Sequence, residues 1–321
     1  MEKLLIKRKQ SYAYSFKRRF SASKFLLLMI IPAIVYYAVF CYAPMYGVLI
    51  AFTKYSPKKG IMGSVTDNWI GFENFKFIFN YPSFWTAFKN TLIIGSLKII
   101  ISFTSAILVA LLINELRMRF FKKGVQIIVT FPHFLSWVVV ASLFRLTLSE
   151  TGGISYLVQQ LGGQPLKFLS DGKLFLSLLF SSDVWKEAGW SSIIYIATMA
   201  GISTDLYEAA NIDGASRIQK IWHVTLPGIR PTAILLLIMS VGGVLSAGFD
   251  QIYNLTGSLN NAVVLDSVQI IDVLIYQGTF GGGGLTMGQT TAIGLFKSLV
   301  GFVLVITTDR IAKLCGERGI I

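Results

Sequence analysis

Six long apolar stretches constrain this chain more than any other feature of its sequence. They cover residues 25–52, 88–113, 125–148, 174–201, 232–256 and 287–308. A helix needs about 20 mainly apolar residues to cross the hydrocarbon layer of a membrane, and each stretch is long enough. Charged residues make up only 14% of the chain, against about 25% in soluble domains. The sequence therefore predicts an all-α integral membrane protein with six transmembrane helices, and it argues against a soluble enzyme.

The distribution of Lys and Arg predicts how the helices are oriented. The segment 1–24, the loops 114–124 and 202–231, and the C-terminal end together hold eighteen of these residues. The loops 53–87, 149–173 and 257–286 hold six. Because basic loops stay on the cytoplasmic side, both termini are expected there, with tails at 1–24 and 312–321 around a permease domain at 25–311. This placement accounts for the net charge of +13 without a nucleic-acid partner and assigns the charge to the lipid surface.

Several ionisable residues fall inside the predicted spans. They are Lys98, Arg145, Asp183, Lys186, Glu187, Asp250 and Lys297. Charges within a membrane are costly and usually face a cavity or a partner. Asp183 and Lys186 are spaced to pair within one helix, so a structural role is one interpretation. No metal site is expected, since the chain has two His and two Cys.

A second interpretation of the same region is a path for a sugar. Sugars stack their C–H faces on aromatic rings and direct their hydroxyls to polar groups. The candidates combine both features in spans four to six: Trp185, Trp190, Asp250, Gln251, Tyr253 and Asn254.

The predicted cytoplasmic loop 203–230 is much longer than an ordinary connection of about 2–8 residues. Asp205 and Glu208 have the spacing of a helix-capping pair, and Gly214 favours a turn at the helix end. A second short helix is expected at about 216–223, ending before Leu226 and Pro227. This helical unit is either a self-capped helix at the membrane surface or a narrow ridge that inserts into a groove of a partner protein.

The spacing of Glu208, Ala209, Ala210, Gly214, Val224, Leu226 and Pro227 resembles the EAA loop of ABC importer permeases. Further segments resemble the oligosaccharide permeases of that class, at 40–60, 131–137, 182–190, 249–254 and 294–298. The resemblance covers nearly the whole chain. It is nearest to the permeases for complex oligosaccharides, of the lipo-oligosaccharide and alginate types, and it is weakest at 255–286.

This resemblance implies a type I ABC importer permease fold and a specific role. The chain would form half of the path of an ATP-driven, binding-protein-dependent oligosaccharide importer in the bacterial cell membrane. Glu208, Ala209, Ala210 and Gly214 would contact a cytoplasmic ATPase subunit, and Leu226 and Pro227 would set the joint to span five. The implied partners are a second, different permease, two ATPase subunits that bind ATP and Mg²⁺, and an extracellular solute-binding protein, either soluble or lipid-anchored. No cofactor is expected in this chain.

Two other classes of membrane protein agree less well with the sequence. A secondary, ion-coupled transporter is expected to show internal repeats and an ion site near the membrane midplane, and no clear repeat is present. An intramembrane enzyme needs a nucleophile–base pair or a metal motif such as H-E-x-x-H, which the sequence lacks. The phosphate-binding motif G-x-x-x-x-G-K-[ST] is absent as well, so the chain is expected to be a transport subunit without ATPase activity.

Overall fold

The computed structural model describes residues 23–281 and 284–314, and every regular element within these ranges is a helix. The predicted all-α class is confirmed for this part of the chain. Four of the described helices are long and apolar enough to cross a membrane, or five if one bent pair forms a single span. The count of six spans and the cytoplasmic termini stay predictions. Residues 1–22 and 315–321, which include most of both basic tails, lie outside the described residues.

The described residues up to Phe72 form a unit of their own. Helix α2 (Lys24–Tyr36) continues through the π-helical segment η1 (Tyr37–Tyr42) and the 3-10 segment η2 (Ala43–Phe52). Together they give the continuous apolar helix Leu27–Phe52, close to the predicted span 25–52. Helix α3 (Gly60–Asp67) follows. The ring of Phe52 stacks on that of Trp69, with the ring centres 5.7 Å apart.

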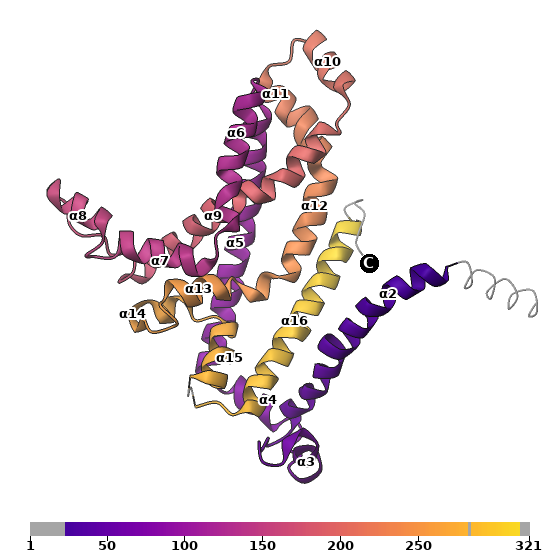
Figure 1. Cartoon of the computed structure of the whole chain (residues 1–321), viewed down its shortest axis with the longest axis vertical. Coiled ribbons are helices and arrows are strands. Elements are labelled where there is room, and N and C mark those ends of the chain that lie inside the picture. Colours follow the sequence, from indigo (N-terminus) through magenta and orange to yellow (C-terminus); the bar gives the residue numbers. More distant parts are fainter. Residues whose placement is uncertain (1–22, 282–283, 315–321) are drawn as a thin grey trace, which may run out of the picture. The chain divides into compact units, whose positions relative to one another are not determined.

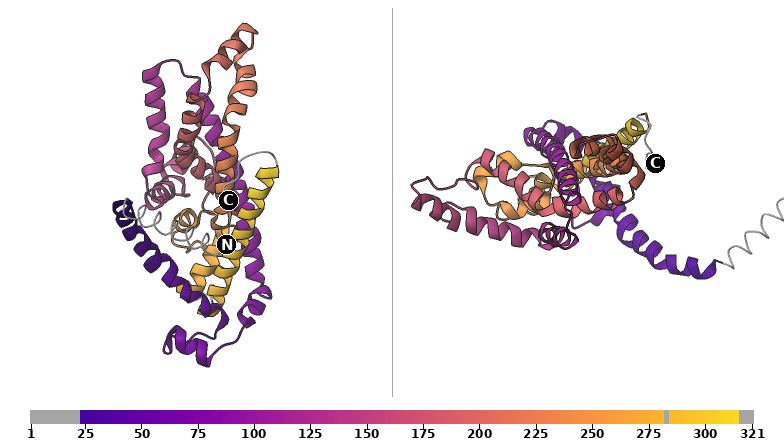
Figure 2. Two further views of the ribbon diagram at one scale, coloured as in Figure 1. Left: turned by 90° about the vertical axis from the view of Figure 1, so that its right-hand side faces the viewer. Right: turned by 90° about the horizontal axis from the view of Figure 1, so that it is seen from above.

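From Glu73 onward the chain forms a second unit, in which the longest helices are α5, α9, α12 and α16 (Figure 1 and Figure 2). Its elements are α4 (Glu73–Phe79), α5 (Pro82–Asn114), α6 (Arg119–Thr130), η3 (Phe131–Phe134), α7 (Trp137–Leu148), α8 (Gly153–Gln160), α9 (Gly172–Ala200), α10 (Thr204–Ile212), α11 (Arg217–Lys220), η4 (Ile221–Thr225), α12 (Leu226–Gly242), η5 (Val244–Ser246), α13 (Phe249–Leu255), α14 (Ala262–Leu265), η6 (Asp266–Val268), α15 (Ile271–Phe280) and α16 (Met287–Leu314).

The centre of this unit is the packing of α5 against α9. A first apolar cluster joins Ile94 of α5 to Phe175 and Leu179 of α9, together with residues from α13 and α15. A second cluster joins α5, α9 and α12 through Ala106, Tyr195, Ala233 and their neighbours. Small residues at these crossings let helix backbones approach closely in a membrane, and the two clusters fix α5, α9 and α12 around one another.

Two predicted spans are interrupted in the structure. In the stretch 125–148, the helical segments Arg119–Phe134 and Trp137–Gln160 meet at a bend of 96°. The extended backbone of Leu135 ends the first segment, and the side chain of Ser136 caps α7 by accepting a hydrogen bond from the Val139 N–H. In the stretch 232–256, helix α12 ends at Gly242. The following loop contains Ala247 and Gly248 with positive φ, a conformation incompatible with a continuing right-handed helix.

The start of α12 also differs from the prediction. Leu226 and Pro227 were expected to end the preceding short helix, but α11, η4 and α12 form one uninterrupted helix, Arg217–Gly242. Pro227 lies in the first turn of α12, directly after the π-helical segment η4. Inside a continuous helix a proline cannot donate the backbone hydrogen bond of its position, and the π-helical segment directly before Pro227 accommodates this missing bond. The helix therefore runs through this joint without a break.

Candidate functional site

Helix α10 contains Glu208, Ala209 and Ala210, the residues that resemble the start of the EAA loop. It lies at one end of the second unit (Figure 1). None of its residues is buried, and the apolar side chains Leu206 and Ile212 are 55% and 87% exposed. Glu208 and Ala209 are exposed as well, and Ala210 is half-buried. Large apolar side chains that are as exposed as Leu206 and Ile212 usually belong to a surface that another protein covers.

The ends of α10 are fixed by two local features. At its start the hydroxyl of Ser203 accepts a hydrogen bond from the Asp205 N–H, so Ser203 is the N-cap and the predicted capping role of Asp205 is wrong. The reason is register, since the helix already begins at Thr204 and the side chain of Asp205 follows the cap. At the other end Gly214 has a φ of +74°, with open space around the position of a Cβ atom. The predicted turn at Gly214 is therefore confirmed.

Two contacts hold α10 against the helix that follows it. The hydroxyl groups of Tyr207 and Thr225 are 2.9 Å apart, and the ammonium of Lys220 donates to the side-chain oxygen of Asn211. A true capping box lies here too, between Ser216 and Gln219 at the start of α11. These bonds tie α10 to the beginning of the long helix Arg217–Gly242.

A cavity of about 330 Å³ opens between α5, α9 and α12, near the loop that follows α12. Its polar lining comes from side chains on three helices: Lys98, Ser102, Asp183, Ser191 and Ser240. Trp190 and Tyr195 add aromatic surface. The lining thus offers both a ring face and hydrogen-bonding groups, which is the combination that sugars need.

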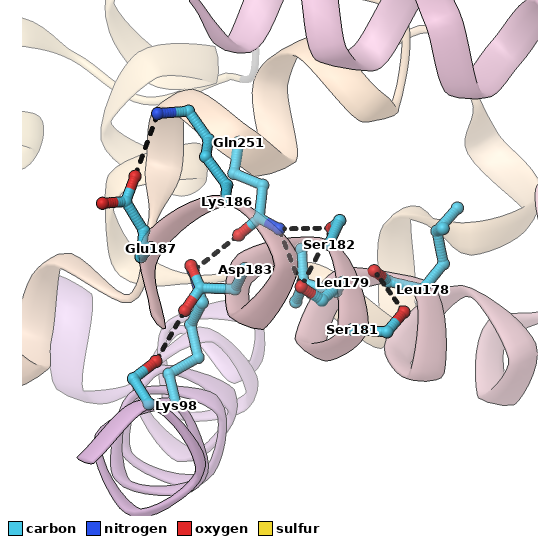
Figure 3. A network of polar contacts seen from close by, with 10 residues as sticks. Lys98, Leu178, Leu179, Ser181, Ser182, Asp183, Lys186, Glu187 and Gln251 are labelled. Carbon is cyan, nitrogen blue, oxygen red and sulfur yellow. Dashed lines mark hydrogen bonds and ion pairs between the residues drawn. The ribbon is translucent and has the colours of Figure 1, made fainter. Parts of the chain in front are cut away.

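A hydrogen-bonded network joins three helices beside this cavity (Figure 3). The ammonium of Lys98 lies 2.9 Å from one carboxylate oxygen of Asp183, and the Ser102 hydroxyl donates to the other oxygen at 2.8 Å. Lys98 also donates to the side-chain oxygen of Gln251. The amide nitrogen of Gln251 in turn donates to the Leu179 carbonyl at 2.7 Å. These bonds connect α5, α9 and α13.

A second charged cluster explains why the predicted pairing of Asp183 with Lys186 is wrong. The ammonium of Lys186 lies 2.9 Å from a carboxylate oxygen of Glu187 and donates to the His133 carbonyl at 2.8 Å. The other carboxylate oxygen of Glu187 is 2.6 Å from Nδ1 of His133. The His133 ring stacks on Trp190, with ring centres 4.4 Å apart. Lys186 therefore faces the segment between α6 and α7, while Asp183 faces α5.

The structure separates the six candidates for a sugar path. Trp190 lines the cavity, whereas Trp185 packs beside Phe144 with ring centres 5.9 Å apart. Gln251 is fully buried and belongs to the network. The others are engaged elsewhere: the hydroxyls of Tyr253 and Tyr276 lie 3.2 Å apart, and Asn254 donates to Asp250 in the same helix. Contact of any of the six with a substrate stays a prediction.

Several residues that line the cavity were not predicted from the sequence. Ser102, Ser191 and Ser240 line the cavity, and the pair of Lys98 and Ser102, one helical turn apart on α5, was the available signal. Lys297 binds Asp272 at 2.6 Å, a residue assigned to an outer loop. In the described part of the chain no three His, Cys, Asp or Glu side chains are grouped so that they could hold a metal ion.

Comparison with known proteins gives three kinds of match. A family described as "Binding-protein-dependent transport system inner membrane component" matches residues 99–317. The polygalacturonan/rhamnogalacturonan transport system permease protein YteP of Bacillus subtilis (strain 168) is 42% identical over 301 residues, which cover 92% of this chain and 90% of that protein. Protein LplB of the same organism is 40% identical over 301 residues, covering 92% of this chain and 91% of LplB.

Solved structures are similar as well. A chain of a bacterial ABC transporter involved in the import of the acidic polysaccharide alginate superimposes with a TM-score of 0.83, at 33% identity, over 93% of this chain and 98% of that one. A second structure of an alginate ABC transporter, in complex with a periplasmic protein that holds an alginate pentasaccharide, gives the same TM-score over 94% of this chain and 99% of that one.

Proposed function

Since this chain belongs to the family of binding-protein-dependent transport system inner membrane components, we propose that α10 is the helix through which a cytoplasmic ATPase drives it. As a member of this family, the chain is a membrane permease component of an ABC sugar importer. It is a transport component rather than an enzyme. In this proposal the cargo is an oligosaccharide. ATP and Mg²⁺ bind the ATPase subunits and not this chain.

The observation that carries the proposal is the exposed motif on α10. Glu208 and Ala209 are open to solvent, and Gly214 lets the chain reverse without a side chain in the way. An exposed, narrow helix with an acidic side chain suits insertion into a groove that presents basic groups. The contacts from Tyr207 and Lys220 support the same role, since they would pass a force on α10 to the helix behind it.

The long helix Arg217–Gly242 connects α10 to the cavity. Arg217–Gly242 has 26 residues, about 39 Å at 1.5 Å per residue. Its far end enters the loop at 243–248, which lines the cavity beside Lys98. A displacement of α10 by an ATPase would therefore reach the cavity through one rigid element. We propose this cavity as part of the sugar route, with Trp190 supplying a ring face.

The remaining partners follow from the same proposal. The chain is expected to form half of the route, so a second permease, of the same fold and a different sequence, would complete it. An extracellular solute-binding protein would deliver the sugar, as the periplasmic protein in the alginate complex holds a pentasaccharide. The chain would lie in the bacterial cell membrane with α10 and both termini in the cytoplasm, as the distribution of basic residues favours.

The test is ATPase activity of the purified complex in lipid, with its binding protein and fragments of polygalacturonan or alginate as probes. Glu208→Ala and Gly214→Asp are expected to abolish stimulation by the loaded binding protein while the complex still assembles. Asp205→Ala is the matched control, because it removes an exposed carboxylate from the same helix outside the motif. Normal stimulation of both motif variants would refute the coupling role of α10.

One result would instead favour the alternative interpretation of the chain as a secondary transporter. If no ATPase co-purifies with the unaltered chain, and transport follows an ion gradient instead, the chain works as a secondary transporter. The sugar probes serve a separate purpose, because a complex that is stimulated by neither fragment but by a third saccharide keeps the coupling assignment and changes only the cargo.

A further inference from the structure

A second hollow lies along the seam between α6 and α9. It has a volume of about 380 Å³. One stripe of α6 and η3 lines it together with one residue of α9: Lys123, Gln126, Ile127, Thr130, Phe131, Phe134 and Ile193. We call it the α6–α9 groove. It belongs to neither the coupling helix nor the cavity.

The groove exists because α6 and α9 cross very closely at one point. A Cβ atom added to Gly189 would lie 2.0 Å from the Val129 carbonyl oxygen, so only glycine permits this approach. Ile193 lies one turn further along α9 and forms the groove's wall. The crossing at Gly189 thus holds the two helices together at the edge of the hollow, and the hollow is a fixed feature of the packing.

The residues that line the groove change from polar at one end to apolar at the other. Lys123 and Gln126 place an ammonium and an amide at the end nearest the start of α6, and Phe131 and Phe134 form the other end. Three of the apolar side chains remain well exposed, at 59% for Ile127, 61% for Phe131 and 68% for Phe134. The order from cationic to apolar matches the order of headgroup and acyl chain in a phospholipid.

One buried atom in the groove lacks a partner. The hydroxyl oxygen of Thr130 makes no hydrogen bond among the residues described, although Thr130 is buried. A buried polar group without a partner is unfavourable, so such groups usually bind a ligand or water. Thr130 lies four residues beyond Gln126, about 6 Å along the helix. Because this oxygen has almost no exposed surface, the Thr130 side chain must turn about its Cα–Cβ bond to meet a ligand oxygen at this depth, and a pure hydrocarbon would offer it no partner.

The groove also lies at the right depth for a lipid. Helix α6 begins at the basic loop 114–124, on the predicted cytoplasmic side. From Lys123 to Phe134 the groove covers about 16 Å along the helix axis. The polar layer of one leaflet is roughly 5–8 Å thick, so the groove extends from this layer into the hydrocarbon.

The charge around the polar end selects the kind of lipid. None of the residues that line the groove is acidic. The adjoining loop 114–124 carries four basic side chains against one acid, Glu115. Juxtamembrane basic residues attract anionic headgroups, and a zwitterionic headgroup would bring its own ammonium close to Lys123.

We propose that the α6–α9 groove binds one anionic phospholipid of the cytoplasmic leaflet. Lys123 and Gln126 donate hydrogen bonds to its phosphate, and the Thr130 hydroxyl donates to an ester oxygen of the glycerol backbone. One acyl chain lies along Ile127, Phe131 and Phe134. The bound lipid fills the wedge between α6 and α9 next to the Gly189 crossing.

Native mass spectrometry of the full chain, titrated with phosphatidylglycerol or phosphatidylcholine, tests the headgroup. Lys123→Ala is expected to weaken binding of phosphatidylglycerol about fivefold, the factor for one Lys near an anionic lipid. Lys122→Ala is the matched control, since its ammonium is directed to the side chain of Asn114, 3.4 Å away, and lies outside the groove. Equal losses for both variants, or equal binding of the two lipids, would overturn the proposal.

A second pair of variants tests the acyl chain. Ile127→Trp fills the groove and is expected to remove the bound lipid, whereas Ile128→Trp, on a residue that is 72% exposed and outside the lining, keeps it. In cell membranes a photoreactive benzophenone side chain in place of Ile127 should crosslink to phospholipid. A crosslink to a polypeptide instead would mean that another protein covers the groove, and the proposal would be wrong.

Discussion

Removal of the Lys98 ammonium tests whether the network beside the cavity holds the second unit together. Lys98→Met keeps most of the length and volume of the side chain. It leaves the Asp183 carboxylate with the Ser102 hydroxyl at 2.8 Å, and it leaves the side-chain oxygen of Gln251 without its donor. Both charged side chains are largely covered, with exposed fractions of 12% and 15%. The variant therefore leaves the Asp183 carboxylate without its cation at a site that is only partly exposed to water.

The size of the effect follows from the geometry. At the observed separation of 2.9 Å, two unit charges attract by about 6 kcal/mol at an effective dielectric constant of about 20. Desolvation offsets much of this attraction, and loss of one partner of a buried pair costs about 3–5 kcal/mol. Because Lys98 and Asp183 both line the cavity, water can reach the stranded carboxylate, and we expect the lower end, about 3 kcal/mol.

The double variant separates the charge effect from packing. Lys98→Met with Asp183→Asn has no stranded charge, and the Asn side chain can still accept from Ser102. It should regain about 2 kcal/mol of the loss. Lys89→Met, on an exposed residue of the same helix, should change stability by less than about 0.5 kcal/mol.

The assay is reversible unfolding in mixed micelles, followed by tryptophan fluorescence. If Lys98→Met is no more destabilising than Lys89→Met, the ion pair does not stabilise the second unit. If the double variant is as unstable as the single one, the loss reflects the missing side chain and not the missing partner.

Two further predictions concern other parts of the chain. Gly189→Ala should destabilise the second unit by about 1–3 kcal/mol, because the new methyl group meets a backbone carbonyl oxygen of α6. Gly124→Ala on α6 has open space around the new methyl group and should stabilise the unit by up to about 1 kcal/mol. The same unfolding assay compares the two variants. In the first unit, the hydrogen bond from Lys59 lowers the pKa of Asp67 below its ordinary value of 3.8. The stabilisation is present above pH 3.8 and is lost as the pH falls through the lowered pKa. Lys59→Ala should return the pKa of Asp67 towards 3.8, measured by NMR of its carboxyl carbon, and an unchanged value would contradict this cause.

The apolar stretches located the helices well and their ends less well. The stretch 174–201 corresponds closely to α9, Gly172–Ala200. The stretch 232–256 does not end with its helix, because hydropathy continues through residues that no longer form one. The signal for the break was present in Gly242, Gly243 and Gly248, since glycine adopts the left-handed backbone that the loop requires at Gly248. A count of apolar residues is insensitive to this conformational freedom.

The partners of the charged residues inside the second unit could not be predicted from the spacing of residues in the sequence. Asp183 and Lys186 are three residues apart on α9, which favours a pair on one helix face. The structure gives each a partner in a different direction, with Lys98 on α5 for Asp183 and the His133 carbonyl for Lys186. Contacts between residues more than 50 positions apart decide these two partners, and only the ion pair of Lys186 with its neighbour Glu187 is local.

The two ends of the helix Arg217–Gly242 suggest where the protein bends under the proposed coupling. Leu226 and Pro227 were expected to form a joint there, yet the helix passes through them unbroken, and Leu226 packs against the cluster of α5 and α9. At the other end the loop 243–248 has no continuous helical ladder, and a Cβ atom on Gly248 would lie 2.3 Å from the Lys98 ammonium. Chains bend at such helix ends more readily than within a packed helix. A displacement of α10 should therefore move the helix as one body and change the backbone at 243–248, beside the ion pair that holds α5 to α9.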